Sequence, residues 1–301
     1  MSTIGRVTHF TVRNSTLENL QNNLSKMSTL QAQMSSGSKI NSASDDPAAT
    51  ADVLRLQGEQ RVLAQYGRNA DDGEAWLTTV DTALQTSLAS VRKARQLTIN
   101  GGDGALGTTS RIALAQEIEG IRDGLLAQAN TTYLGRPVFA GTSAGPAFTE
   151  GTYAYNGVTR TPGLPDASVD RTVASGTTIR VDSYGADVYG SGTESIFAVL
   201  DEIIGTLRDG GDPTDQLDAI DGHVNKMLAE VSSVGARQNQ IDSAQSVIST
   251  DQLTSTTRLS AIMDVDLAQI ILDLGSQEVA YKGALSAAAK VLQPTLLDFL
   301  R

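Results

Sequence analysis

Apolar residues recur at spacings of three and four along most of the chain, which is the pattern of amphipathic α-helices. The pattern is clearest near the two ends of the chain. Near the N-terminus, in almost heptad spacing, the stripe comprises Leu17, Leu20, Leu24, Met27, Leu30 and Met34. Near the C-terminus it comprises Leu267, Ile271, Leu274, Tyr281, Leu285 and Leu292. Because an apolar stripe on a helix has to be buried, we predict that these residues form an interface between the two terminal helices and between copies of the chain.

The residues between the positions of the N-terminal stripe are mostly amides and hydroxyls, and only Glu18 and Lys26 are charged. A free coiled coil usually carries charged flanks that select its partner. Uncharged polar flanks favour a helix packed inside a multi-helix assembly, and an ordinary two-stranded coiled coil is the alternative. We expect such terminal helices to be weakly ordered in the monomer and to fold when copies pack together. Glu278 is the one charge in the C-terminal stripe, and the pattern assigns it no role.

Between the terminal stripes, two helical regions enclose a segment of different composition. From residue 136 to residue 192, short runs of β-branched and aromatic residues alternate with Gly, Pro and Thr, which is typical of strands and turns. Tyr153 to Thr159 predicts a hairpin on Asn156-Gly157, and Thr178 to Asp182 predicts a further strand. The fold class is therefore mainly α with a small β insertion. We expect the N- and C-terminal halves to form an elongated antiparallel helical rod, with the β-rich domain at its far end.

This order of segments predicts three domains. They are the terminal core helices (residues 1–44 and 262–301), a helical rod domain (residues 45–135 and 193–261) and the central insertion domain (residues 136–192).

Particular residues predict where the helices begin, bend and end. Gly37 follows the N-terminal stripe, and a glycine in the left-handed conformation commonly ends a helix. Asp46 can cap the next helix, with Pro47 in its first position. Further along, Gly67 and Gly73 each weaken a helix by about 1 kcal/mol relative to Ala, which predicts a kink or a break.

Composition excludes several classes of function. The chain has 301 residues, no cysteine and a formal charge of −11, so thiol chemistry is excluded and binding to nucleic acid is disfavoured. No apolar run reaches the roughly 20 residues that span a bilayer. The first residues lack the apolar core of a cleaved signal peptide. We therefore expect a protein without membrane insertion, either cytosolic or exported by a route that does not read such a signal.

Two motifs formally match cofactor and metal sites. The run GGDGALG from Gly101 to Gly107 contains G-x-G-x-x-G, but a predicted helix precedes it where a dinucleotide site needs a strand, so we interpret it as a loop between helices. The carboxylate pairs Asp45-Asp46 and Asp264/Asp266 suggest a metal only weakly, and helix capping is the better interpretation. We predict no cofactor and no metal.

A third motif matches a hydrolase. Gly141 to Gly145 fits G-x-S-x-G around Ser143, and His223 follows it in the hydrolase order. That nucleophile elbow requires a strand, a turn and a helix, and the sequence after Pro146 predicts no helix. We therefore expect the chain not to be an enzyme, with a serine hydrolase as a remote alternative.

The motifs at both ends resemble one known family. The run MSSGSKINSASDDPAATADVLRLQ, the helical run SRIALAQEIEGIRDGLLAQANTTYLGRPVFAGT and the closing run DVDLAQIILDLGSQEVAYKGALSAAAKVLQPTLLDFL are similar to successive parts of the bacterial flagellin superfamily, in particular of its members at the hook–filament junction. The resemblance covers residues 1–141 and 195–301, and the β insertion matches only loosely.

This resemblance implies a structural protein of the bacterial flagellum, exported by the flagellar type III apparatus without a cleaved signal peptide. It would form a ring of identical copies between hook and filament. Its implied partners are the adjacent hook-associated junction protein, flagellin and an export chaperone. On the matched motifs, Asn41, Asp45, Asp46 and Pro47 lie in the connection between core helix and rod, and Arg237 and Asn239 lie in the C-terminal half of the rod.

Two alternatives remain beside this resemblance. A flagellin, the filament subunit, has similar motifs, but usually continues DDAAG where this chain has DDPAA, and ends without the LLDFL found here. Pro294 departs from the smooth closing helix that the resemblance to junction proteins implies, because it should kink or end the last helix. A cytosolic coiled-coil scaffold is the other alternative.

Overall fold

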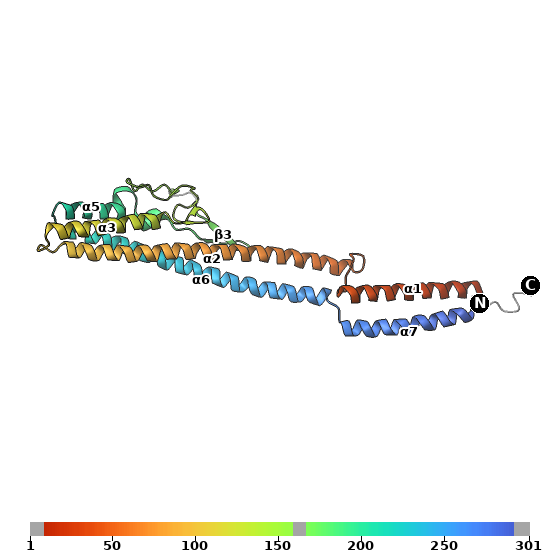
Figure 1. Cartoon of the computed structure of the whole chain (residues 1–301). Helices are drawn as coiled ribbons and strands as arrows, with labels where there is room; N and C mark the ends of the chain where they lie inside the picture. Colours follow the sequence, from red (N-terminus) through yellow and green to blue (C-terminus); the bar gives the residue numbers. More distant parts are fainter. Residues whose placement is uncertain (1–8, 159–166, 292–301) are drawn as a thin grey trace, which may run out of the picture. The chain divides into compact units, whose positions relative to one another are not determined.

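The computed structural model describes residues 9–158 and 167–291, which are mainly helical with small antiparallel β hairpins, so the predicted fold class is confirmed (Figure 1). The chain divides into two compact units, residues 1–61 with 252–301 and residues 62–251. Helices α2 (Pro47–Gly101) and α6 (Leu217–Met263) contribute to both. The three-domain division stays a prediction. Among the described helices, none is both long enough and apolar enough to cross a membrane.

The first unit pairs the two ends of the chain. Helix α1 (His9–Ser36) lies beside α7 (Leu267–Val291) (Figure 1). The side chain of Gln277 donates to the backbone oxygen of Asn23 at 3.3 Å and to its side-chain oxygen at 3.1 Å. Near the other end of the pair, the N–H of Val265 donates to the carbonyl of Gly37 at 3.3 Å. The two helices are therefore antiparallel, as the terminal stripes predicted.

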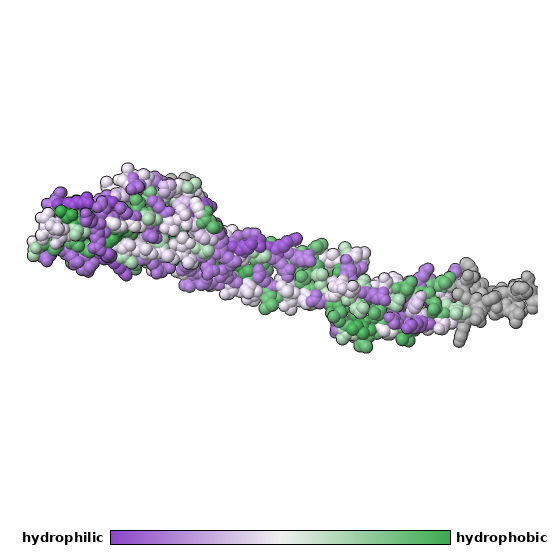
Figure 2. Space-filling view, viewed as in Figure 1, coloured by the Kyte–Doolittle hydropathy of each residue, from purple (hydrophilic) through white to green (hydrophobic). Residues whose placement is uncertain are grey.

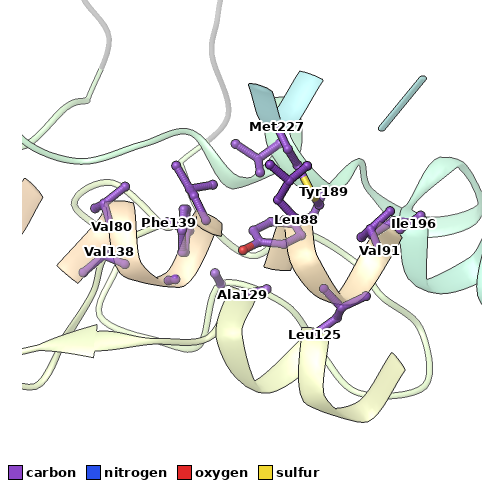
Figure 3. Close-up of a cluster of buried hydrophobic side chains, with 14 of the residues drawn as sticks. Val80, Leu88, Val91, Leu125, Ala129, Val138, Phe139, Tyr189, Ile196 and Met227 are labelled. Atoms are coloured by element: carbon purple, nitrogen blue, oxygen red, sulfur yellow. The ribbon is translucent and has the colours of Figure 1, made fainter. Parts of the chain in front are cut away.

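The second unit is a helical bundle with the insertion packed on it. Within it, α2 and α6 are antiparallel, because Arg95 pairs with Asp221 at 2.6 Å and Gln245 donates to Glu74 at 2.9 Å. Helices α3 (Thr108–Ala129) and α5 (Ile196–Arg208) pack against each other beside them. One apolar core joins the helices to the insertion; Figure 3 labels Val80, Leu88, Val91, Leu125, Ala129, Val138, Phe139, Tyr189, Ile196 and Met227.

Helix α2 is continuous over its 55 residues, so the predicted break at Gly67 and Gly73 is wrong. A Cβ atom at Gly73 would lie 3.0 Å from the Ile241 side chain and 3.2 Å from that of Val181. Gly73 therefore allows α6 and the insertion to approach α2 closely, and tertiary packing outweighs its poor helix propensity.

The insertion forms two hairpins. Strands β1 (Thr132–Tyr133) and β2 (Arg136–Pro137) form the first, and β3 (Asp170–Ala174) and β4 (Thr177–Arg180) form the second. Strand β4 confirms the predicted strand at residues 178–182, although it ends two residues earlier.

The predicted hairpin on Asn156-Gly157 is wrong. Tyr155 instead forms an antiparallel bridge with Phe148, and the N–H of Val158 donates to the carbonyl of Ala140 at 3.3 Å. Thr159 lies outside the described residues. The Tyr155 hydroxyl donates to the carbonyl of Phe139, so tertiary contacts override the local turn signal.

The insertion lies along the side of α2, which corrects its predicted place at the far end of the helices. The Asn69 side chain donates to the carbonyl of Thr172 at 2.8 Å, and the Ser87 hydroxyl is 2.9 Å from that of Tyr189, in the short helix α4 (Gly185–Tyr189). At the end of the unit, Gly101 instead approaches Leu207 and Pro213, the first residue of η2 (Pro213–Gln216). Burial of the aromatic side chains of the insertion against α2 accounts for this placement.

Two neighbouring glycines near α5 predict different costs of substitution. Gly190 has a φ of 79°. Gly192, the first residue of the 3₁₀ turn η1 (Gly192–Glu194), has a φ of 56°. A Cβ at Gly190 would lie 2.4 Å from the backbone oxygen of Glu194, whereas one at Gly192 has nothing within 4 Å. We expect Gly192→Ala to cost about 1 kcal/mol and Gly190→Ala several times more, because the backbone must also move. Urea unfolding of both variants measures the difference, and equal costs would contradict the clash.

Candidate assembly surface

One face of α7 packs on α1 inside the chain. On α7, Ile270 and Ala288 are buried and four further side chains between them are half-buried: Leu274, Gln277, Tyr281 and Ala284. Among the α1 side chains whose burial is described, the half-buried ones are Thr16, Leu20, Asn23, Met27, Leu30 and Gln33. These two rows form the seam between the terminal helices, and the row on α7 follows strict heptad spacing.

A second apolar face of α7 is exposed. We call it the outer face, and it comprises Leu267, Ile271, Leu272, Val279 and Leu285, whose exposed fractions lie between 51% and 71%. Figure 2 shows a hydrophobic patch over the N-terminal half of α7. Leu17, Leu24 and Met34 of α1 are exposed as well. A cluster of this kind on a helix is typical of surfaces that pack on another molecule.

The predicted interface residues divide between these two surfaces. Five of them lie in the seam: Leu20, Met27, Leu30, Leu274 and Tyr281. Six are exposed: Leu17, Leu24, Met34, Leu267, Ile271 and Leu285. Leu292 lies outside the described residues. Their role in assembly stays a prediction.

Sequence reasoning missed three residues of the seam and, on the outer face, Leu272 and Val279. Ile270, Gln277 and Ala284 belong to the seam, and a search for strict heptad spacing through Leu274 would have found them. Glu278, which the pattern left unassigned, is 3.9 Å from Lys282 on the exposed side of α7. An exposed pair at this spacing contributes little to stability.

The two connections between helices in the first unit lie side by side. Gly37 ends α1 with φ of 70°, as predicted. Ser38 and Asp264 form an antiparallel bridge, and the N–H of Lys39 donates to the carbonyl of Met263 at 2.6 Å. Backbone hydrogen bonds therefore tie the connection from α1 to α2 to the connection from α6 to α7.

The predicted motif connection is exposed, and its carboxylates accept hydrogen bonds from backbone N–H groups. One Asp45 carboxylate oxygen accepts from the N–H of Asn41 at 3.0 Å. Asp46 accepts from the N–H of Ala49 at 2.9 Å and caps α2, with Pro47 in the first position. Asp266 caps α7 in the same way, accepting from the N–H of Ala268 at 2.9 Å. Asp46 and Asp266 therefore act as helix caps, as expected, whereas Asp45 and Asp264 do not: Asp45 holds the loop before α2, and the Asp264 carboxylate accepts from the Ser260 hydroxyl.

Arg237 anchors the insertion to α6. Its guanidinium donates to the carbonyl of Asp182 at 2.6 Å and to the Glu230 carboxylate at 2.5 Å, and its side chain is only 13% exposed. The Ser183 hydroxyl donates to the same Glu230 oxygen at 2.5 Å. Asn239, the neighbouring motif residue, is exposed.

The hydrolase and cofactor motifs lack the surroundings that their chemistry needs. Ser143 lies in a turn, its hydroxyl donates to the carbonyl of Asn156 at 3.3 Å, and no helix follows it between residues 144 and 158. His223 is buried on α6. The GGDGALG run connects α2 to α3, as predicted.

His223 predicts a dependence of stability on pH. Burial lowers the pKa of its imidazole and nearby Lys226 lowers it further, against opposing hydrogen bonds to the backbone of Val188 and Glu194. Below the ordinary histidine pKa of about 6.5, the unfolded chain therefore binds more protons than the folded one, so stability should fall as pH drops from 7 toward 5. His223→Gln should flatten this fall, as urea unfolding at both pH values measures. An equally steep fall in the variant would contradict the assignment.

The two units differ sharply in charge. Residues 1–61 and 252–301 contain ten basic and ten acidic residues, whereas residues 62–251 contain thirteen basic and twenty-four acidic ones. The whole formal charge of −11 therefore belongs to the second unit. Packing between copies through the first unit would therefore meet no net charge repulsion.

Comparison with known proteins gives concordant matches. Family models of the bacterial flagellin N-terminal and C-terminal helical regions match residues 7–144 and 217–300. A flagellar hook-associated protein 3 from Salmonella typhimurium is 25% identical over 296 residues, which cover 89% of this chain and 91% of that protein. A flagellin from Bacillus subtilis is 25% identical over 316 residues, which cover 98% of this chain and all of that protein.

The fold is also similar to a solved structure. Flagellar hook-associated protein 3 from Legionella pneumophila superposes with a TM-score of 0.61 at 15% identity, covering 70% of this chain and 98% of that one. At this identity the likeness concerns the fold alone.

Proposed function

Because the chain belongs to the bacterial flagellin superfamily, we propose that it is a structural protein of the flagellum that forms the junction layer between hook and filament. The single observation that carries the assembly part of this proposal is the outer face of α7, an exposed apolar surface on a helix whose other face is already paired with α1. An exposed apolar surface of this kind is typical of a site that packs on another molecule.

The distribution of charge supports the same proposal. A ring or tube brings many copies of the terminal helices close together, and a net charge on each copy would oppose this packing. The first unit has equal numbers of acidic and basic residues. It therefore packs with its copies mainly through apolar contacts.

The partners and the location follow from this role. The chain forms a homo-oligomeric ring and contacts the adjacent hook-associated junction protein on one side and flagellin on the other. An export chaperone holds it before secretion through the flagellar type III apparatus without a cleaved signal, so the assembled protein is extracellular. It has no catalytic activity. The likeness to hook-associated protein 3 over most of both chains supports these points.

A filament subunit is the second candidate function. The match to Bacillus subtilis flagellin spans 98% of this chain at the same 25% identity, which favours this candidate. Against it stand the DDPAA motif at Asp45 and the LLDFL ending.

Deletion of the gene separates the two candidates. In a junction role, deletion removes filaments from the cell while flagellin is still exported and accumulates in the medium. In a filament role, deletion removes the exported filament protein itself. Restoring the gene should restore filaments in both cases. Intact filaments after deletion would contradict both candidates.

A further inference from the structure

The hairpin between β1 and β2 carries an unusual turn. Tyr133 pairs with Arg136, so Leu134 and Gly135 are the two residues of the turn, and their φ angles are 48° and 77°. Positive φ at both positions is typical of a type I′ turn, which favours Asn followed by Gly. A leucine at the first position is strained, because its Cβ opposes the left-handed conformation.

The base of this hairpin is fixed on α2. The Tyr133 ring lies 5.4 Å from the buried Trp76 ring, and its hydroxyl donates to Asp72 at 3.3 Å. The guanidinium of Arg136 lies over the same Trp76 ring, 5.8 Å from its centre. The hairpin therefore cannot readily turn its tip toward the protein, and Leu134 is held outward.

Leu134 is 81% exposed, more than any other large hydrophobic side chain in the described residues. The other described non-glycine residue with positive φ, Tyr153, is buried and its hydroxyl donates to Asp201 at 2.6 Å. Contacts within the chain therefore offset the strain at Tyr153. No such burial offsets the strain at Leu134, which points to a contact with another molecule.

A pocket of suitable character lies on the same unit. It has a volume of about 540 Å³ and opens between the end of α3 and residues 146–150. Leu126, Pro146 and Phe148 supply apolar lining, and Glu150 adds negative charge, whereas Asp123 is paired with Arg122 of the same chain at 2.7 Å. The exposed Arg136, whose guanidinium lies over Trp76, stands two residues from Leu134 and has the charge complementary to that of Glu150.

We propose that Leu134 of one copy inserts into this pocket of a neighbouring copy. The contact joins two different surfaces, so each copy offers a hairpin to one neighbour and a pocket to the next, and such heterologous contacts build rings or helical tubes. This inference rests on the proposed function, because it requires copies of the chain side by side. It adds a contact through the acidic second unit to the contacts of the terminal helices.

Disulfide trapping tests this contact in flagella. The chain has no cysteine, so a Leu134→Cys copy and an Ala127→Cys copy can be produced together in a strain that lacks the native gene. Ala127 is exposed and lines the pocket. Oxidation of isolated flagella should give a disulfide-linked dimer only when both variants are present. Flagella that form normally but give no dimer would overturn the inference and leave the proposed function intact.

A second pair of variants covers the case in which cysteine copies fail to assemble. Leu134→Asn relieves the strain of the turn, so the purified variant should unfold at the same or a higher urea concentration. It loses the apolar contact, so association between copies should weaken roughly tenfold or more. Leu134→Met keeps the apolar side chain and should assemble normally. Equal stability of the filaments on cells that carry Leu134→Asn and on cells that carry Leu134→Met would overturn the inference. Normal filaments on cells that lack the gene would instead refute the proposed function.

Discussion

Replacing Ile271 and Leu272 by Asp should leave the chain folded as a monomer and abolish its self-assembly. Both side chains belong to the outer face and are more than half exposed, so the monomer loses little on substitution. If neighbouring copies bury them, their loss removes about 3 to 6 kcal/mol per copy, or more than roughly a hundredfold in affinity. Sedimentation velocity measures the association, and circular dichroism measures the helix content.

Two variants serve as controls for this prediction. Leu274→Asp alters the seam, so it should lower the helix content of the monomer as well as assembly. Val247→Asp changes an equally exposed apolar residue on α6, in the second unit, and should leave assembly nearly unchanged. Unchanged assembly in the Ile271/Leu272 variant, or a loss of helix as large as that of Leu274→Asp, would count against an intermolecular role of the outer face.

Replacing Arg237 by Met should destabilise the second unit by about 3 kcal/mol. The substitution keeps most of the side-chain volume but removes the bonds to the Asp182 carbonyl and to Glu230, whose side chain is 23% exposed. A largely buried carboxylate without its partner carries an uncompensated charge, which is more costly than the loss of the pair itself. Trp76 is the one tryptophan and lies beside the insertion, so its fluorescence reports urea unfolding.

A double variant tests this reason. Glu230→Gln added to Arg237→Met removes the unpaired charge and should recover part of the lost stability. A cost below about 1 kcal/mol for Arg237→Met alone, or no recovery in the double variant, would show that the network does not anchor the insertion.

The ends of the helices were predictable because short-range chemistry determines them. Gly37 ends α1 in the left-handed conformation, and the Asp46 carboxylate accepts from a backbone N–H three residues later. Each of these effects involves only a few neighbouring residues. The pairing of the terminal helices was predictable because two long apolar stripes have to be buried.

The face that α7 turns toward α1 was not predictable from spacing alone. Helix α7 is apolar around most of its circumference, so Ile270 and Ile271 fit a helical stripe equally well, although they point about 100° apart. The structure places Ile270 in the seam and exposes Ile271. Which face pairs within the chain depends on the facing residues of α1, which a single-helix pattern does not contain.

Contacts between distant segments account for the other differences. Gly73 signals a weak helix locally, but it lies where Ile241 and Val181 approach α2. The placement of the insertion beside α2 depends on pairs such as Ser87 with Tyr189, which are 102 residues apart in sequence. No local pattern carries this information.

Labelling of a single cysteine tests the central claim most directly. Because the native chain has no cysteine, Leu272→Cys introduces the one thiol on the outer face, and Ala288→Cys introduces one in the seam. The Leu272→Cys thiol should react rapidly with a maleimide in the monomer and much more slowly in the assembled protein, while the Ala288→Cys thiol, which α1 covers in the seam, should react more slowly than the Leu272→Cys thiol in the monomer. Equal reaction rates of the Leu272→Cys thiol in monomer and assembly would contradict the claim that neighbouring copies cover this face.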